Sequence, residues 1–319
     1  MKRTLGILVL VVLVCSLSSF AFAGKAKVIE KTFDRVESLR VKTILGDCII
    51  KQGSGSEISV RVEYTYDDDE FEATFKERGG TLYIEEDLDG NNIDGDSEWL
   101  IVVPEGIDIK FESATGGLKA SGIEGRLRAK SGTGAFLISG FKGELEAKSG
   151  TGDITLADAE GEFELNSGTG DINVEDAAGS FDANSGTGDV KIDKAKGDFE
   201  ANSGTGNVEA FELSLDDYGE FSSGTGNAEV ELPAGEEYEL EVSSGTGKAS
   251  IECGGADLDA HVEMSAKKRS GKISSSFDFE DEEEYYSGDD KYVRKWFTEG
   301  SGSRKIEIRT GTGRAKIKK

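Results

Sequence analysis

The tetrapeptide Ser-Gly-Thr-Gly recurs along the centre of this chain at a spacing of eighteen residues. Apolar and polar residues alternate on both sides of it, as in Phe163 and Leu165 before one copy and Ile172 and Val174 after it. Alternation with a period of two predicts β-strands with one buried face. Repetition at a fixed period is typical of stacked coils. The evenly spaced copies begin at Ser131, Ser149, Ser167, Ser185 and Ser203.

Each repeat consists of two similar halves, since Phe181 and Val190 stand nine residues apart. A three-sided coil with six-residue sides would repeat the apolar character of Phe163 at Thr169 and Glu175, and it does not. We therefore expect an all-β fold, a parallel β-solenoid in the form of a flattened two-sided β-helix with about 18 residues per coil.

The Ser-Gly-Thr-Gly segments are expected to form the turns, because glycine readily adopts the positive φ that a tight turn often needs. Stacking would place Ser on Ser and Thr on Thr about 4.8 Å apart, so we expect ladders of hydroxyl groups that bond to one another. Asn166, Asn184 and Asn202 form a similar column, whose amides can hydrogen-bond along the stack.

Weaker copies of the motif extend the register in both directions, and they begin at Ser113, Ser223, Ser244 and Thr310. We therefore predict one domain over residues 24–319. Degenerate N-terminal coils and hairpins are expected at 24–106 and regular coils at 107–255. An irregular loop and a C-terminal closing coil are expected at 256–319.

Residues 1–23 have the pattern of a secretory signal peptide: a basic start, an apolar run over 5–14 and the small-x-small sequence that ends at Ala23. Val14 precedes Cys15 where a lipidation signal needs a small residue, so lipidation is not expected. No later apolar stretch is long enough to span a bilayer. The mature chain is thus predicted to be exported, whether periplasmic, cell-surface or secreted.

The formal net charge of −26 disfavours nucleic acid and anionic lipid as partners. Two cysteines remain after the signal peptide, Cys48 and Cys253. An exported compartment permits a disulfide between them, but two small buried residues fit the sequence as well.

Several segments together carry a family resemblance: LGDCII at 45–50, VPEG at 103–106, the SGTGDI repeats, LPAG at 232–235 and TGTGRAKI at 310–317. With them the chain resembles the bacterial β-solenoid family named "putative adhesin", also known as domain of unknown function 4097. The resemblance implies an extracytoplasmic, non-enzymatic binding or scaffolding domain. Some members are associated with envelope stress responses, and the family has no catalytic residues to carry over.

Motifs for catalysis are weak. His261 is the single histidine, so it supports no Ser-His-Asp arrangement. Gly245 to Ser250 resembles the end of a phosphate-binding loop but has Ala249 where Ser or Thr is required. A polysaccharide-active β-helix enzyme would need two carboxylates in a cleft, for which a thin coil has no room. We expect no enzyme activity.

No cofactor is expected, although two sets of residues are weak calcium candidates. Asp87, Asp89, Asn91 and Glu98 take positions 1, 3, 5 and 12 of a calcium loop, but Asn92 replaces the glycine of position 6. The second set follows the turns at the spacing of a calcium-binding β-roll, but the opposite turns lack the β-roll pattern, so a structural role is favoured. That set is Asp153, Asp171 and Asp189.

The segment after the last regular coil combines an acidic run at 278–284 with a cluster of aromatic residues. It is either a charged cap over the end of the stack or a partner-binding patch with aromatic anchors. The candidate anchors are Tyr285, Tyr286, Tyr292, Trp296 and Phe297.

The function we expect is that of an exported, adhesin-like binding or scaffold protein of the cell envelope, with a repetitive acidic surface. Its partner would be an envelope or extracellular component, protein or polysaccharide. The alternative is an envelope-stress signalling or sensing module that binds its partner through the C-terminal segment. A calcium-binding β-roll and a polysaccharide-active enzyme are lesser alternatives.

Overall fold

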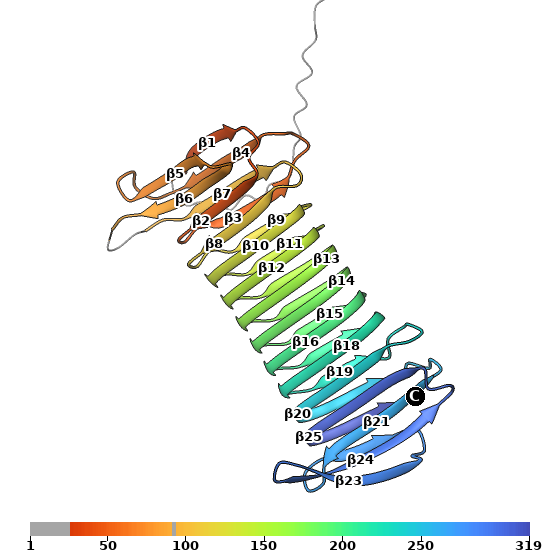
Figure 1. Cartoon of the computed structure of the whole chain (residues 1–319). Helices are drawn as coiled ribbons and strands as arrows, with labels where there is room; N and C mark the ends of the chain where they lie inside the picture. Colours follow the sequence, from red (N-terminus) through yellow and green to blue (C-terminus); the bar gives the residue numbers. More distant parts are fainter. Residues whose placement is uncertain (1–25, 91–93) are drawn as a thin grey trace, which may run out of the picture.

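The structure is a computed structural model that describes residues 26–90 and 94–319. The predicted signal peptide, residues 1–23, and Asn91 lie outside the described residues. All regular elements in the described ranges are strands, and none of these residues form a helix that could cross a bilayer. The strands stack into an elongated rod with a broader group of strands at each end (Figure 1).

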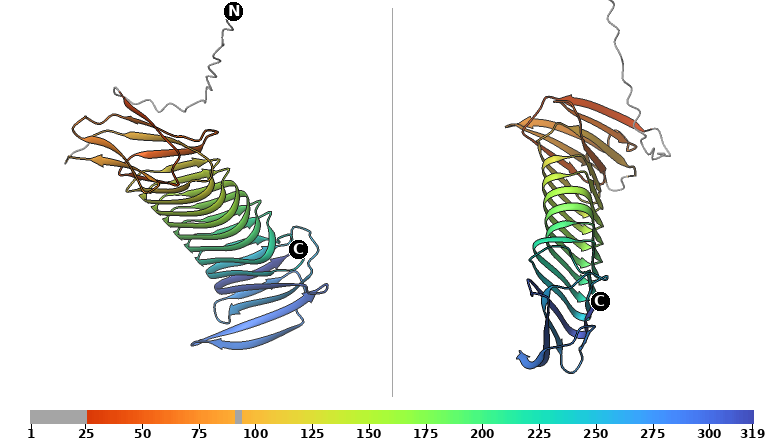
Figure 2. Two further views of the ribbon diagram at one scale, coloured as in Figure 1. Left: turned by 45° about the horizontal axis from the view of Figure 1, so that its top comes forward. Right: turned by 90° about the vertical axis from the view of Figure 1, so that its right-hand side faces the viewer.

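The middle of the rod consists of parallel strands in two ladders (Figures 1 and 2). One ladder runs through β8, β10, β12, β13, β14, β16, β18 and β20, and the other through β9, β11, β13, β14, β15, β17, β19 and β20. The bounds are β8 Asp108–Ser113, β9 Leu118–Ser121, β10 Glu124–Thr133, β11 Phe136–Ser139, β12 Lys142–Thr151, β13 Ile154–Thr169, β14 Ile172–Thr187, β15 Val190–Asp193, β16 Lys196–Thr205, β17 Val208–Phe211, β18 Ser214–Thr225, β19 Ala228–Glu231 and β20 Glu239–Glu252.

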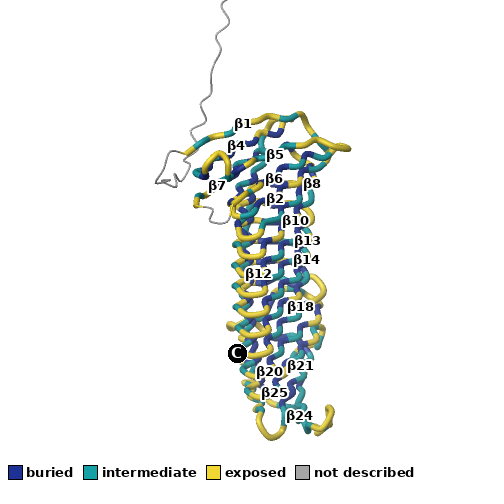
Figure 3. The backbone as a smooth tube through the Cα atoms, turned by 90° about the vertical axis from the view of Figure 1, so that its left-hand side faces the viewer, coloured by how far each residue is buried: buried dark blue, intermediate teal, exposed yellow. Residues whose placement is uncertain are grey.

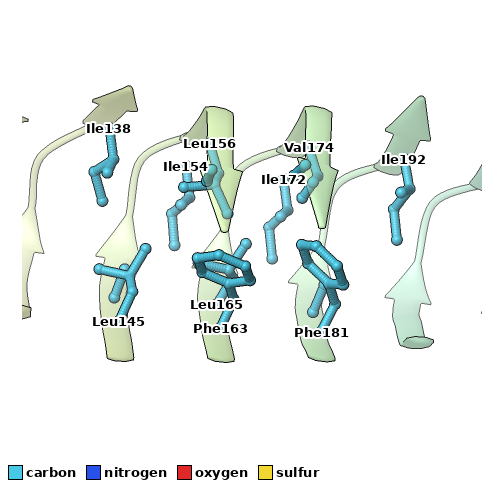
Figure 4. Packing of buried hydrophobic residues seen from close by; sticks show 14 of the residues in the cluster. Ile138, Leu145, Ile154, Leu156, Phe163, Leu165, Ile172, Val174, Phe181 and Ile192 are labelled. Atoms are coloured by element: carbon cyan, nitrogen blue, oxygen red, sulfur yellow. The ribbon is translucent and has the colours of Figure 1, made fainter. Parts of the chain in front are cut away.

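The register between neighbouring coils places like residues side by side. Phe163 lies opposite Phe181, and Phe181 lies opposite Phe199. Their ring centroids are 4.9 and 4.8 Å apart, and all three rings are buried. Figure 4 shows Phe163 and Phe181 pointing toward Leu156 and Val174 of the other ladder. The prediction of an all-β, solenoid-like fold is confirmed.

The N-terminal end inserts its first coil between strands that come later in the sequence. Strand β2 lies between β6 and β8, and β3 lies between β7 and β9. Two antiparallel groups, β1–β4–β7 and β5–β6, complete this end. The bounds are β1 Lys27–Phe33, β2 Ser38–Thr43, β3 Asp47–Gln52, β4 Ile58–Tyr64, β5 Phe71–Arg78, β6 Thr81–Leu88 and β7 Ser97–Val103.

The C-terminal strand is also inserted. Strand β25 lies in parallel between β20 on one side and β21 and β22 on the other, so Thr312 stands opposite Thr246. The hairpin β23–β24 then pairs with β21 and covers the end of the stack. The bounds are β21 Ala260–Lys267, β22 Lys272–Ser275, β23 Asp281–Ser287, β24 Asp290–Glu299 and β25 Arg304–Lys318.

Buried residues form a continuous column along the rod, and the turns that flank it are exposed (Figure 3). The two glycines of a Ser-Gly-Thr-Gly turn serve different purposes. Gly170 has a φ of +147°, as the sequence predicts, but Gly168 does not have positive φ. A Cβ at Gly168 would stand 2.5 Å from the carbonyl oxygen of Gly150, so here the absent side chain permits close stacking.

The serine hydroxyls do not form the expected ladder with one another. Ser185 instead donates to the carbonyl oxygen of Gly170 in the preceding coil at 2.8 Å, and Ser203 donates to Gly188 at 2.7 Å. The serine therefore bonds to backbone, because the carbonyl of the neighbouring turn points to the same buried corner. The asparagine ladder is present between Asn202 and Asn184 at 3.1 Å.

At the opposite corner of the coils, residues spaced by eighteen adopt the left-handed conformation. Gly122 and Gly140 have φ of +64° and +62°, and the same corner then continues with residues other than glycine. Those residues are Asp158, Asp176, Lys194 and Glu212, with φ between 50° and 52°. The left-handed conformation costs an L-residue roughly 1–2 kcal/mol.

We therefore expect Lys194→Gly to stabilise the protein. Relief of the left-handed strain should exceed the greater entropy of glycine in the unfolded chain, for a net gain of about 0.5–1 kcal/mol. Lys191→Gly is the matched control, because Lys191 is an exposed lysine within β15 and should lose stability. Urea unfolding of both variants measures the difference, and a loss of stability in Lys194→Gly would contradict the prediction.

Candidate binding site

A shallow groove of about 1000 Å³ follows one corner of the stack. Successive coils line it with the same three positions, for example Lys148-Ser149-Gly150 and Asn166-Ser167-Gly168. We call it the corner groove. Glu112 is the one carboxylate among its lining residues.

A deeper site, the C-terminal pocket, lies at the same corner near the end of the rod and encloses about 500 Å³. Turns of β20 and β25 form one wall, and Ser265 of β21 lies beside them. Tyr285 of β23 and Tyr292 and Arg294 of β24 form the other wall. The pocket exists because the hairpin folds over the inserted strand β25, which brings Arg309 to the same cavity.

The two tyrosines of the pocket stack on each other, with ring centroids 5.5 Å apart. The guanidinium carbon of Arg294 lies 4.9 Å from the centre of the Tyr285 ring. Arg294 is also 3.5 Å from a carboxylate oxygen of Glu263 and 3.5 Å from one of Glu283. These contacts hold the cation against the aromatic pair.

The second guanidinium of the pocket, Arg309, is bound by acids of the outer face. It donates to Glu307 and, at 3.1 Å, to Glu241. The hydrogen bond to Glu307 raises the pKa of Arg309. Burial raises the pKa of Glu241, and the nearby Arg309 opposes that shift. The guanidinium of Arg309 therefore stays protonated.

The aromatic candidates separate into four environments. Tyr285 and Tyr292 line the C-terminal pocket. Tyr286 is 71% exposed, and Lys291 lies over its ring. Trp296 is half-buried between Glu263 and Asp281 in the sheet. Phe297 is 1% exposed and stacks on Phe277, so it belongs to the core and offers no surface to a partner.

Sequence reasoning did not find Ser265 and Arg309 as pocket residues. The terminal Thr-Gly-Thr-Gly copy would align Arg309 with Ser243, and the structure pairs these two residues. The alignment does not show, however, that β25 lies next to β21. That contact depends on the insertion of the C-terminal strand.

The first set of calcium candidates is spread over separate elements. Asp87 is an exposed residue of β6, Asp89 follows that strand, and Glu98 lies on β7. Burial and the neighbouring Glu63 raise the pKa of Glu98. Across the described ranges, no group of three or more His, Cys, Asp or Glu residues is placed to hold a metal ion.

The second set, the aspartates after the turns, bonds to backbone. The Oδ1 atom of Asp153 accepts the N–H of Asp171 at 2.8 Å, and Asp171 accepts that of Asp189 at 2.8 Å. The series continues with Asn207 and Asn227, whose Oδ1 atoms accept the corresponding N–H groups of the next coils. This position therefore requires an oxygen that accepts a hydrogen bond and does not require a negative charge. That requirement explains the change from Asp to Asn along the column.

This geometry predicts a specific order of stability at Asp171. Asp171→Asn retains the oxygen that accepts the N–H of Asp189, so its free energy of unfolding should stay within about 0.5 kcal/mol of the original. Asp171→Ala should lose about 0.5–1 kcal/mol, since it removes the acceptor. Chemical unfolding without calcium measures both. Equal losses for the two variants would show that the charge matters instead.

Among the described residues, the other side chains of reactive type are the single histidine and two free cysteines. The Nδ1 atom of His261 lies 3.0 Å from the hydroxyl of Thr298, and its Nε2 atom lies 3.7 Å from Glu263. Cys48 and Cys253 are both buried and free, so the alternative of a disulfide between them is wrong for this structure. Burial raises the pKa of both thiols.

The fold and the pocket define a β-solenoid-like protein with an open corner groove and a pocket at its C-terminal end. The family model Toastrack DUF4097 matches residues 36–276. The chain belongs to this family, as its sequence motifs indicate.

Three solved structures are similar to the chain over most of its length, at low identity and low TM-score. A "putative cell adhesion protein" from Clostridium sporogenes is 17% identical over 92% of this chain and 99% of its own, with a TM-score of 0.28. A "putative adhesin" from Bacteroides fragilis is 13% identical over 91% and 97%, with a TM-score of 0.32. A "putative lipid binding protein" from Parabacteroides distasonis is 14% identical over 93% and 98%, with a TM-score of 0.28. No curated protein matches the chain.

Proposed function

We propose that this chain is an exported, adhesin-like binding or scaffold protein of the cell envelope, whose flattened two-sided coils of about 18 residues repeat one acidic surface. The observation that carries the proposal is the register of the coils. It places Glu146, Glu164, Asp182, Glu200 and Glu220 opposite one another on successive strands.

A carboxylate column of this kind offers equivalent contacts about 4.8 Å apart. Each contact with a carboxylate at the protein surface is weak. A polymeric partner that engages several of them at once gains avidity without one tight site. The net charge of −26 favours a cationic or polyhydroxylated partner and disfavours nucleic acid. Export, the remaining part of the proposal, rests on the signal-peptide pattern of residues 1–23.

A binding role without catalysis is supported by the placement of the acids. The carboxylate column lies on the outer face of the strands, and the C-terminal pocket is lined by arginine, tyrosine, serine, threonine and glycine. Hydrolysis of a glycosidic bond needs two carboxylates that face each other across the bond. Neither surface offers that arrangement.

The alternative, a sensing module that binds its partner through the C-terminal segment, is favoured by one observation. The hairpin β23–β24 builds a pocket with exposed polar groups instead of only covering the end of the stack.

Co-sedimentation of the full mature chain with envelope fractions, with and without calcium, separates the two functions. A fourfold Glu164→Gln, Asp182→Asn, Glu200→Gln and Glu220→Gln variant removes charge from the coil face. A Tyr285→Ser, Tyr292→Ser variant alters the pocket instead. The proposed function predicts that the first variant loses most of its binding and the second retains most of it. The reverse result would establish the alternative, and no retention of the unmodified chain by any envelope fraction would contradict both.

A further inference from the structure

Two polar groups at the centre of the C-terminal pocket lack hydrogen-bond partners. Ser265 is only 4% exposed as a residue, but its hydroxyl oxygen, which has no hydrogen bond within the described residues, remains open to the pocket. The Nε atom of Arg294 is buried and also has no partner. The two residues are register partners in β21 and β24. Buried polar groups are nearly always paired, so the unpaired Nε of Arg294, beside the pocket-lining hydroxyl of Ser265, indicates an acceptor that the chain itself does not supply.

The turn residues beside them are satisfied. Ser244 donates to the carbonyl of Gly226 at 2.8 Å, and Thr310 donates to that of Gly247 at 3.1 Å. The unpaired state of Ser265 is therefore not a general property of this corner of the stack. Ser265 lies between Arg309 on β25 and Arg294 on β24, and the cover of these strands is what buries it.

The charge of the pocket differs from that of the chain. Its only charged lining residues are Arg294 and Arg309, whereas the whole chain has a net charge of −26. The ion pairs of Arg294 are long, at 3.5 Å each, and a guanidinium has five N–H donors. Arg294 therefore keeps donors for a ligand. A planar carboxylate fits them because it can accept two parallel hydrogen bonds from one guanidinium.

The other walls suit a sugar ring. The stacked Tyr285 and Tyr292 offer an aromatic surface with polar tips, and Ser243 and Ser287 add hydroxyls. The volume of about 500 Å³ lies within the range of small-ligand sites. The pocket has no continuous apolar lining, which disfavours an acyl chain.

We propose that the C-terminal pocket binds a carboxylate-bearing sugar, the uronic-acid class of unit found in acidic polysaccharides. Arg294 and Ser265 donate to the carboxylate, Arg309 supplies the second positive charge, and the tyrosine pair contacts the ring. This inference rests on the proposed binding function, because it names the ligand class of a pocket whose charged lining residues are two arginines.

The experiment is isothermal titration calorimetry of the full mature chain with trigalacturonate. Maltotriose, a neutral sugar of the same length, and glycerol phosphate, a phosphate carrier, are the comparison ligands. We expect trigalacturonate to bind and maltotriose to bind at least about tenfold more weakly, since the neutral sugar leaves the donors unpaired. Glycerol phosphate should also bind more weakly than trigalacturonate, because it lacks the planar carboxylate.

Variants locate the binding. Ser265→Ala and Arg294→Gln should each weaken the affinity about tenfold, the effect of losing a charge-assisted hydrogen bond. Tyr286→Ser and Arg314→Gln are matched controls outside the pocket and should leave the affinity unchanged. Thermal unfolding checks each variant. If Arg294→Gln does not fold, Ser265→Ala and Tyr285→Ser carry the test.

Three results would overturn the proposal: no binding of trigalacturonate at millimolar concentration, equal binding of maltotriose, or tighter binding of glycerol phosphate. If the control variants lost as much affinity for trigalacturonate as the pocket variants, the assignment of binding to the C-terminal pocket would be overturned. The envelope co-sedimentation experiment tests the proposed function independently of the calorimetry. If co-sedimentation persists while trigalacturonate fails to bind, the ligand class is wrong and the proposed function stands.

Discussion

Gly179→Ala is expected to destabilise the protein by about 3 kcal/mol or more, a loss at the upper end of single-substitution effects. Gly179 stands opposite Gly161 in the ladder. A Cβ at Gly179 would lie 1.8 Å from the carbonyl oxygen of Gly161 and 2.8 Å from its carbonyl carbon. Both are backbone atoms of a hydrogen-bonded ladder, so neither coil can move without breaking its pairing with the next coil.

A control separates this clash from backbone strain. Gly122 also has positive φ, but a Cβ there would meet nothing within 4 Å. Gly122→Ala should therefore lose only about 1 kcal/mol, from the left-handed conformation alone. Guanidinium unfolding, followed by circular dichroism, measures both variants. Equal losses for the two would contradict the close approach of the coils.

The second large effect is expected at Glu86, a buried carboxylate of β6 that is 4% exposed. One of its oxygens accepts three successive backbone N–H groups, from Ile44 at 2.5 Å, Leu45 at 2.9 Å and Gly46 at 3.1 Å. The other oxygen accepts the hydroxyl of Ser97. This single side chain thus fixes the turn that joins β2 to β3, the coil that is inserted between later strands.

Glu86→Leu should lose about 3–5 kcal/mol, because it leaves buried donors without an acceptor. Glu86→Gln retains one oxygen for the turn and should lose less. Asp87→Leu is the matched control, since Asp87 is the exposed neighbour on the same strand and should change stability by about 0.5 kcal/mol. Urea unfolding gives the three values. A loss at position 86 no larger than that at position 87 would show that the turn holds without the carboxylate.

The stack itself could be predicted from the sequence because its information is local. The spacing of Ser167 and Ser185 equals one coil, and the alternation around Phe163 and Phe181 shows which side chains face inward. Each coil then contacts only its neighbours, so the pattern of one repeat determines the next.

The ends of the rod could not be predicted in the same way. The copy at Thr310 indicates a coil, but nothing in its residues shows that β25 enters the stack between β20 and β21. The insertion of β2 and β3 could not be predicted for the same reason, because it depends on contacts between segments far apart in sequence. The left-handed corner was also missed, because Lys194 and Glu212 are not residue types that favour positive φ, although the Asp at position 158 is one that tolerates it.

The candidate site could be predicted in part, because some of its residues follow from local sequence and others depend on contacts between distant segments. Local aromatic composition identified Tyr285 and Tyr292, which do line the pocket, but it also selected Phe297, which is buried in the core. A strand alternates its faces, so neighbouring aromatics cannot all be exposed on one side. Ser265 joins the pocket only through the inserted strand.

The central claim, that units eighteen residues apart lie directly against each other, is tested most directly by disulfide trapping. Glu164 and Asp182 are register partners, and a disulfide requires Cα atoms roughly 4.4–6.8 Å apart. Glu164 and Glu200 are two coils apart. In Cys48→Ala, Cys253→Ala protein, the Glu164→Cys, Asp182→Cys pair is expected to cross-link nearly completely with no loss of folded protein. The Glu164→Cys, Glu200→Cys pair should remain reduced. Efficient cross-linking of the second pair, or failure of the first in folded protein, would contradict the stacked register.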